Sequence, residues 1–180
     1  AVLDEGMDVN QEDLIAKIVG SINFTDAPEG AVARCWDGHG TAVGGIAAAS
    51  SNNGMGIAGI SWNATLYNLK IAYTQTADPD ERWVTQSSWQ ANAIAWAAFN
   101  VDVLNNSWGG GTPSTILSLT IASALSNNRV VVFASGNDNR NSLDYPASLS
   151  SGNNGLLAVG ASNLCDFRKT PNNDNCNNFE

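Results

Sequence analysis

The stretch that most constrains this chain runs from Asp37 to Ala49 and contains the only histidine of the protein, His39. The residues after His39 are small and uncharged, which predicts a buried helix with the histidine at its N-terminal end. Gly44 and Gly45 lie inside that helix, where each glycine costs about 1 kcal/mol relative to alanine and therefore needs a packing reason. A helix with so few side chains can lie directly against a sheet. We expect this arrangement to leave His39 exposed, and histidine is suited to proton transfer near neutral pH.

The composition indicates one globular domain without internal repeats or a linker. The chain has 180 residues, of which 43% are hydrophobic and 14% charged, and its net charge is −9. This acidity argues against nucleic acid and anionic membranes as partners, and no apolar run approaches the roughly 18 residues of a membrane-spanning helix. The chain opens directly on an apolar run. We therefore expect that any export signal or pro-segment has been removed and that the protein is secreted or extracellular.

Three cysteines, Cys35, Cys165 and Cys176, leave one thiol unpaired or bonded outside this chain. Cys165 and Cys176 enclose a polar, Asn-rich loop and can form one disulfide. Cys35 lies four residues before His39, which suggests a catalytic thiol. We disfavour this hypothesis because the chain has a single histidine, which cannot serve both a catalytic thiol and another catalytic arrangement.

Apolar strands alternate with helices along the chain, which indicates βαβ units and a parallel sheet covered on both faces. The sequence therefore predicts an α/β fold in one domain. The expected helices cover residues 39–49, 87–99 (capped by Ser87 or Ser88) and 113–126 (with Pro113 in the first turn). The expected strands cover residues 1–3, a segment ending near Asn23, and residues 66–72, 101–105, 129–133 and 156–160.

Polar or glycine-rich segments follow several of these strands. Asp4 follows residues 1–3, the segment 107–111 follows the strand 101–105, and Asn137 lies soon after the strand 129–133. In an open parallel sheet, ligands bind beyond the carboxyl ends of the strands, so these positions are candidates for a functional site. Taken alone, Asp4 is also typical of a turn residue, and a single histidine is typical of an ordinary core or surface position.

Four motifs occur in a fixed order: Asp4-Glu5-Gly6, His39-Gly40-Thr41, Ser107-Trp108-Gly109 and Gly136-Asn137. This order resembles that of the subtilisin-like serine proteases, the subtilases, and the resemblance covers residues 1–162. It implies a subtilisin-like three-layer sandwich with a central parallel sheet and helices on both faces. The domain implied for residues 1–180 is a single but incomplete subtilase catalytic domain.

The resemblance implies an Asp–His–Ser mechanism, for which subtilisin is itself a worked example. His39 would act as general base, Asp4 would hold its tautomer and stabilise imidazolium, and Asn137 would donate its side-chain amide to the oxyanion. A protein or peptide substrate would lie as an added strand between two walls that leave room for a sizeable uncharged side chain. The walls would be Ser107, Trp108 and Gly109, with Trp108 narrowing the entrance, and Ala134, Ser135 and Gly136.

The loop after the His39 helix resembles the strong calcium site of the same family. Residues 50–57 are rich in asparagine and glycine, which tolerate positive φ and can turn carbonyl oxygens inward. Such a loop is typical either of an ordinary helix C-cap or of an oxygen cage for a hard cation. The resemblance implies calcium as a structural cofactor. Its ligands would be Asp13, Ser50, Asn53, Met55 and Ile57.

The sequence departs from the family at the nucleophile. It contains neither Gly-Thr-Ser nor a Gly-x-Ser-x-Gly elbow. We expect the serine beyond residue 180, and we count the remainder of the catalytic domain among the expected partners. Glu5 stands where the family usually has serine or threonine, a change that we expect to leave the Asp–His pair untouched.

The favoured function is a calcium-stabilised, secreted serine endopeptidase. The alternative is a catalytically inactive subtilase-like domain that binds peptides or serves as a scaffold. A nucleotide-binding α/β domain is disfavoured, because no glycine fingerprint follows the first strand at the required spacing.

Overall fold

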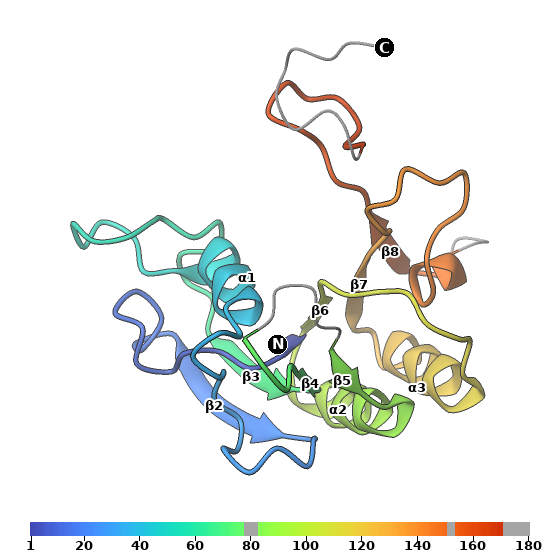
Figure 1. The fold of residues 1–180 in the computed structure, drawn as a ribbon, viewed down its shortest axis with the longest axis horizontal. Coiled ribbons are helices and arrows are strands. Elements are labelled where there is room, and N and C mark those ends of the chain that lie inside the picture. The colour runs from blue at the N-terminus through green and yellow to red at the C-terminus, as the bar shows by residue number, and fades with distance from the viewer. Residues whose placement is uncertain (78–82, 151–153, 171–180) are drawn as a thin grey trace.

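A computed structural model describes residues 1–77, 83–150 and 154–170 of the chain (Figure 1). Six strands form one sheet in the order β2-β3-β1-β6-β7-β8, and every neighbouring pair in it is parallel. The predicted α/β fold with a central parallel sheet is therefore confirmed. The strands are β1 (Val2–Asp4), β2 (Ile18–Asn23), β3 (Leu66–Lys70), β6 (Val103–Asn106), β7 (Val130–Ala134) and β8 (Leu156–Val159).

Helices cover both faces of this sheet. Helix α1 (His39–Ala48) lies on one face, and α2 (Ser87–Asn100) and α3 (Thr115–Ser126) pack together on the other (Figure 1). A short 3-10 helix, η1 (Ala147–Ser150), precedes β8. These three layers match the sandwich that the sequence predicts.

Strand β1 lies near the centre of the sheet and is buried from both sides. Successive side chains of a strand point to opposite faces, so Val2 and Leu3 enter different cores. Val2 packs in a cluster with Ala48 of α1. Leu3 packs in a larger cluster with Ile94 of α2 and Leu117 of α3. The residue that follows, Asp4, is thus held on a strand that the cores fix on both faces.

The two glycines inside α1 differ in how closely they are packed. A Cβ at Gly44 would lie 2.9 Å from Met7 Sδ, so the absence of a side chain allows α1 to approach the segment after β1. A Cβ at Gly45 would lie 3.6 Å from Ile57 Cδ1, which is an ordinary van der Waals distance. The packing reason predicted for both glycines therefore holds for Gly44 alone.

A small hairpin follows the carboxyl end of β3. Its strands β4 (Ala72–Tyr73) and β5 (Val84–Thr85) pair antiparallel. The predicted strand over residues 66–72 is divided at Ile71, whose N–H still donates to the Asp4 carbonyl. Beyond that bond the chain leaves the sheet and pairs with β5.

Two helix starts differ from the sequence prediction. Helix α2 begins after an extended Gln86, and no side chain caps it, so neither Ser87 nor Ser88 is the N-cap. Helix α3 has Ser114 as its N-cap, which places Pro113 before the helix rather than in its first turn.

The cysteines are partly described. Cys165 is disulfide-bonded, whereas Cys35 is free and exposed. Cys176, the predicted partner of Cys165, lies outside the described residues. In the described ranges, no helix is both long and apolar enough to span a membrane.

Candidate active site

A carboxylate–imidazole pair joins two of the predicted site residues. His39 Nδ1 lies 2.9 Å from Asp4 Oδ1 and 3.0 Å from Asp4 Oδ2. The Asp4 side chain is 1% exposed and the His39 side chain is 48% exposed. A carboxylate facing Nδ1 holds the tautomer with hydrogen on that nitrogen, which leaves Nε2 as a proton acceptor. The pair therefore has the geometry of a general base with an orienting carboxylate.

The fold brings this pair together from positions 35 residues apart. Asp4 is the last residue of β1, and His39 is the first residue of α1. Their approach depends on Gly40, because a Cβ there would overlap the carbonyl oxygen of Gly6 and lie 3.1 Å from Asp4 Cβ. Gly6 itself has a φ of 97°, a conformation that favours glycine. The two glycines thus allow the helix start to rest on the strand end.

A second buried carboxylate lies at the start of α1. Glu5 is 3% exposed, and its Oε1 accepts a hydrogen bond of 2.6 Å from the backbone N–H of His39. This N–H belongs to the first turn of α1 and has no acceptor within the helix, so Glu5 supplies the acceptor from the segment after β1. The expectation that Glu5 leaves the Asp–His pair untouched is therefore wrong.

These carboxylates shift the proton equilibrium of the imidazole. The hydrogen bond to Asp4 raises the pKa of His39 above its ordinary value of 6.5, burial opposes this, and the charges of Asp4 and Glu5 add to the rise. Burial also raises the pKa of the Glu5 carboxyl, and the hydrogen bond from His39 opposes that rise. The surroundings stabilise imidazolium, the form that a general base takes during reaction.

A cavity of about 550 Å³ lies beside the imidazole. The predicted substrate wall of Ser107, Trp108 and Gly109 lines this cavity together with His39, so the structure brings these predicted residues together. Trp83 also lines it, and its ring lies 5.6 Å from the His39 ring at an interplanar angle of 77°. The imidazole therefore faces a space with aromatic side chains on its border. Thr85, Gln90, Gly110 and Gly111 complete the lining.

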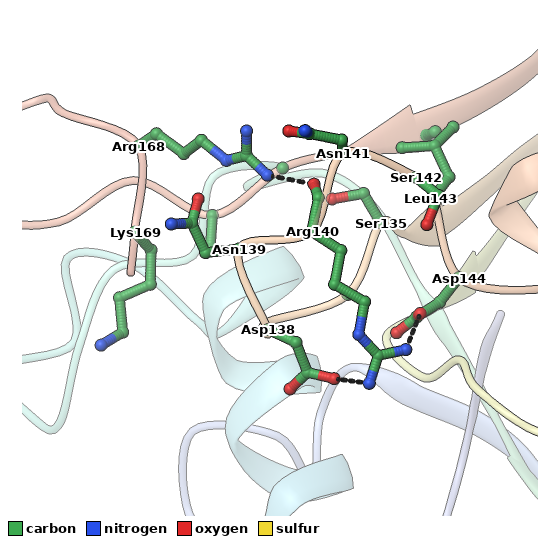
Figure 2. Close-up of a pocket in the computed structure, with 14 residues that line it drawn as sticks. Ser135, Asp138, Asn139, Arg140, Asn141, Ser142, Leu143, Asp144, Arg168 and Lys169 are labelled. Atoms are coloured by element: carbon green, nitrogen blue, oxygen red, sulfur yellow. Dashed lines mark hydrogen bonds and ion pairs between the residues drawn. The ribbon is translucent and has the colours of Figure 1, made fainter. Parts of the chain in front are cut away.

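The facing wall borders a different cavity. Ala134 is the last residue of β7, and the next two residues, Ser135 and Gly136, line a cavity of about 440 Å³ (Figure 2). The two predicted walls nevertheless meet, because a Cβ at Gly109 would lie 3.5 Å from the carbonyl oxygen of Ala134. The walls thus separate two cavities instead of enclosing a single one.

The remaining predicted catalytic residue, Asn137, follows Gly136 and is exposed. Strand β7 pairs with β6, and β6 pairs with β1. Asp4, Ser107 and Asn137 therefore all lie at the carboxyl edge of three neighbouring parallel strands. This is the edge at which parallel sheets bind their ligands.

The predicted calcium ligands gather around Asp13, which is 2% exposed. Its carboxylate accepts hydrogen bonds from Asn53 Nδ2 at 2.6 Å and from the N–H of Ile57 at 2.9 Å. Its carbonyl oxygen accepts a hydrogen bond of 2.9 Å from the N–H of Ser50. The loop after α1 is thus folded around one buried carboxylate.

Two further contacts bear on whether a cation fits this loop. The N–H of Met55 donates to Asn53 Oδ1 at 3.2 Å, and a Cβ at Gly56 would overlap the Asp13 carboxylate. No group of three or more His, Cys, Asp or Glu side chains forms a metal cluster in the part of the chain that the structure describes. Both Asp13 carboxylate oxygens and the Asn53 side-chain oxygen accept N–H donors here, so a calcium ion held by these oxygens would have to replace those hydrogen bonds.

Besides Glu5, the side chains of Trp83 and Asp144 contact residues of the site without having been predicted to do so from the sequence. Trp83 belongs to the polar segment before β5, where no periodicity distinguishes it. Asp144 lies in the loop between β7 and β8, and its N–H donates to the carbonyl oxygen of Ser135 at 3.1 Å. Both reach the site through contacts between residues that are distant in sequence or lie in loops, and local patterns do not encode such contacts.

Comparisons with known proteins identify the family and the fold of this chain. A sequence model of the Subtilase family matches residues 1–178. Subtilisin E of Bacillus subtilis (strain 168) is 36% identical over 173 residues, which cover 93% of this chain and 42% of that protein. The Major intracellular serine protease of the same strain is 34% identical over 170 residues, which cover 89% of this chain and 50% of that protein. The chain therefore spans about half the length of these relatives.

A solved structure shares the fold. Sphericase superimposes with a TM-score of 0.76 over 91% of this chain and 53% of its own, at 24% sequence identity. At that identity the likeness supports the architecture alone.

Proposed function

Because this chain belongs to the subtilase family, we propose that it forms part of the catalytic domain of a secreted serine endopeptidase. The observation that carries the proposal is the Asp4–His39 pair. A buried carboxylate contacts Nδ1 through both of its oxygens, and the half-exposed imidazole borders a cavity. These are the properties that a general base in acyl transfer requires.

In the proposed reaction, His39 Nε2 removes the proton of a serine hydroxyl as that oxygen attacks the peptide carbonyl carbon. The resulting imidazolium is stabilised by Asp4, which stays ionised. His39 then gives the proton to the leaving amine, and a water repeats the sequence to release the acyl group. The serine would lie beyond residue 180, in the remainder of the catalytic domain.

Binding of the substrate would use the carboxyl edge of the sheet. The peptide would lie along Ser107 to Gly109 as an added strand, with backbone hydrogen bonds holding it in register. The side-chain amide of Asn137 would donate to the oxyanion that forms at the attacked carbonyl. The position of Asn137 beyond β7, two strands from Asp4, supports this role.

Two further features accompany the proposal. The disulfide at Cys165 supports secretion, because disulfides persist in oxidising compartments. The loop around Asp13 would hold a calcium ion through Asn53 and the carbonyl oxygens of Ser50, Met55 and Ile57. That ion would supply stability and would take no part in the chemistry.

Peptide hydrolysis by the full-length protein tests the proposal. We expect the wild-type protein to cleave unstructured peptides, and we expect His39→Ala to lower kcat by at least about 10⁴-fold, as in other enzymes with this triad. Cys35→Ser is the matched control, because it removes the free exposed thiol and should leave activity unchanged.

The other outcomes separate the alternatives. Activity lost in Cys35→Ser but kept in His39→Ala would contradict the assignment of the base. Peptides that bind to the wild-type protein without being cleaved would favour the inactive scaffold.

A further inference from the structure

The side chain of Asp144 lines the cavity beside Gly136 and lies at the point where the two substrate walls meet. A Cβ at Gly136 would overlap Asp144 Oδ2 and lie 2.8 Å from its Cγ. A Cβ at Gly109, on the other wall, would lie 3.5 Å from Asp144 Cβ. Asp144 therefore touches both walls where they meet, and its side chain is 22% exposed. From the small residues of the two walls, the sequence predicts room for an uncharged side chain here, and Asp144 is not among the predicted site residues.

We propose that Asp144 makes this cavity a subsite for a basic side chain, so that the substrates are peptides with lysine or arginine at the cleaved bond. This inference rests on the proposed function. Asn137 would bind the carbonyl of the cleaved bond, and Gly136 precedes it directly. The side chain of the same substrate residue would then lie beside Ser135 and Gly136, which line the cavity that contains Asp144.

A guanidinium group of the chain itself already lies in this cavity. Figure 2 shows the Arg140 side chain between Asp138 and Asp144. Its Nη2 lies 2.5 Å from Asp138 Oδ2, whereas its Nη1 lies 3.7 Å from Asp144 Oδ1. The first contact is a close, charge-assisted ion pair, and the second is too long for a hydrogen bond. Arg140 shows that a guanidinium fits between these carboxylates.

The carboxylate of Asp144 is able to accept hydrogen bonds from a closer cationic group. Within the described residues, Arg140 is the one charged side chain that pairs with the Asp144 carboxylate, at 3.7 Å. In the same residues, the Asp144 carboxylate accepts no hydrogen bond. Arg140 is 61% exposed and can be displaced toward Asp138 and solvent. A substrate lysine or arginine would then donate directly to Asp144 in a space partly shielded from water, where such a bond is strengthened.

Basic groups on the opposite border of the cavity raise the competing hypothesis of an acidic ligand. Arg168 Nη2 donates to the backbone carbonyl of Arg140 at 2.6 Å (Figure 2). Lys169 Nζ donates to the Thr170 carbonyl at 2.9 Å. These groups stand on the segment after β8. The group at the junction of the walls is the Asp144 carboxylate, which would repel an acidic side chain. The observations therefore favour a basic one.

A set of peptides that differ only in the residue before the cleaved bond tests this inference on the full-length protein. With lysine, arginine, leucine and glutamate compared at that position, we expect the highest kcat/KM for the basic residues. Asp144→Asn should lower the ratio of kcat/KM for lysine over leucine at least about tenfold. Arg140→Gln should lower KM for the lysine peptide, because it removes an internal competitor for Asp144.

The matched control is Asp102→Asn, which removes a 99% exposed carboxylate just before β6, at the opposite edge of the sheet, and should leave the lysine-to-leucine ratio unchanged. Three results would overturn the inference while leaving the endopeptidase proposal intact. They are equal cleavage of the lysine and leucine peptides, a lysine-to-leucine ratio of kcat/KM that Asp144→Asn does not alter, and a preference for glutamate. A protein that cleaves none of the peptides would instead overturn the proposed function.

Discussion

The Glu5 carboxylate accepts a hydrogen bond of 2.6 Å from the backbone N–H of His39. Glu5 and its neighbour Asp4 therefore both bind His39. Asp4 holds the imidazole ring, and Glu5 holds the backbone at the first turn of α1. The last residue of β1 and the residue that follows it therefore position His39 through two consecutive side chains, both buried. A negative charge at a helix N-terminus is also favourable, because it complements the helix dipole.

The first prediction concerns the pH dependence of activity. His39 must be neutral to accept a proton, so activity rises as pH increases through its pKa. Because Glu5 is one of the groups that raise this pKa, Glu5→Gln should move the acid limb of the kcat/KM profile to lower pH. Asp102→Asn, which changes a carboxylate far from His39, should leave the limb in place. An acid limb that stays in place or moves to higher pH in Glu5→Gln would contradict the electrostatic role of Glu5.

The second prediction concerns the oxyanion. Asn137→Leu keeps a side chain of similar size but removes the amide donor. We expect kcat to fall by about 10²–10³-fold with little change in KM, a magnitude that is known from subtilisin. Steady-state kinetics on one peptide substrate measures both constants. A fall that appears mainly in KM would show that Asn137 binds the ground state and would exclude the oxyanion role.

The third prediction compares two glycines of the same helix. Gly40→Ala should destabilise the fold by about 1–3 kcal/mol, because the new Cβ would overlap a backbone oxygen that cannot move aside. Gly45→Ala should be neutral or stabilise by up to about 1 kcal/mol, because its Cβ has room and alanine favours the helix. Urea denaturation of both variants measures the difference. Equal effects at the two positions would show that α1 does not pack on β1 as described.

Local features of the fold and the site were predictable from the sequence, whereas several contacts between distant residues were not. The strand and helix patterns marked the positions of Asp4 and His39, and the resemblance to the subtilases predicted that the two residues form a pair. Glu5, Trp83 and Asp144 were not predicted to contact the site. Their contacts depend on how a helix start, a hairpin and a loop meet in space, and neither periodicity nor composition specifies that.

The fourth prediction concerns calcium. If the loop around Asp13 binds the ion, Ca²⁺ at 100 times its dissociation constant should stabilise the full-length protein by about 2.7 kcal/mol. Thermal unfolding in chelator and in excess Ca²⁺ should therefore differ for the wild-type protein and much less for Asp13→Asn. Glu12→Gln is the control, since Glu12 is the exposed neighbour of Asp13 and should retain the full response. An equal calcium response in Asp13→Asn would place the ion elsewhere.

The most direct test of the central claim is labelling of the full-length protein with a fluorophosphonate, which reacts with an activated serine, followed by identification of the modified residue. The proposal that His39 activates a serine predicts one labelled serine outside residues 1–180 and labelling that is lost in His39→Ala. Labelling that persists in His39→Ala, or a wild-type protein that takes no label, would contradict it.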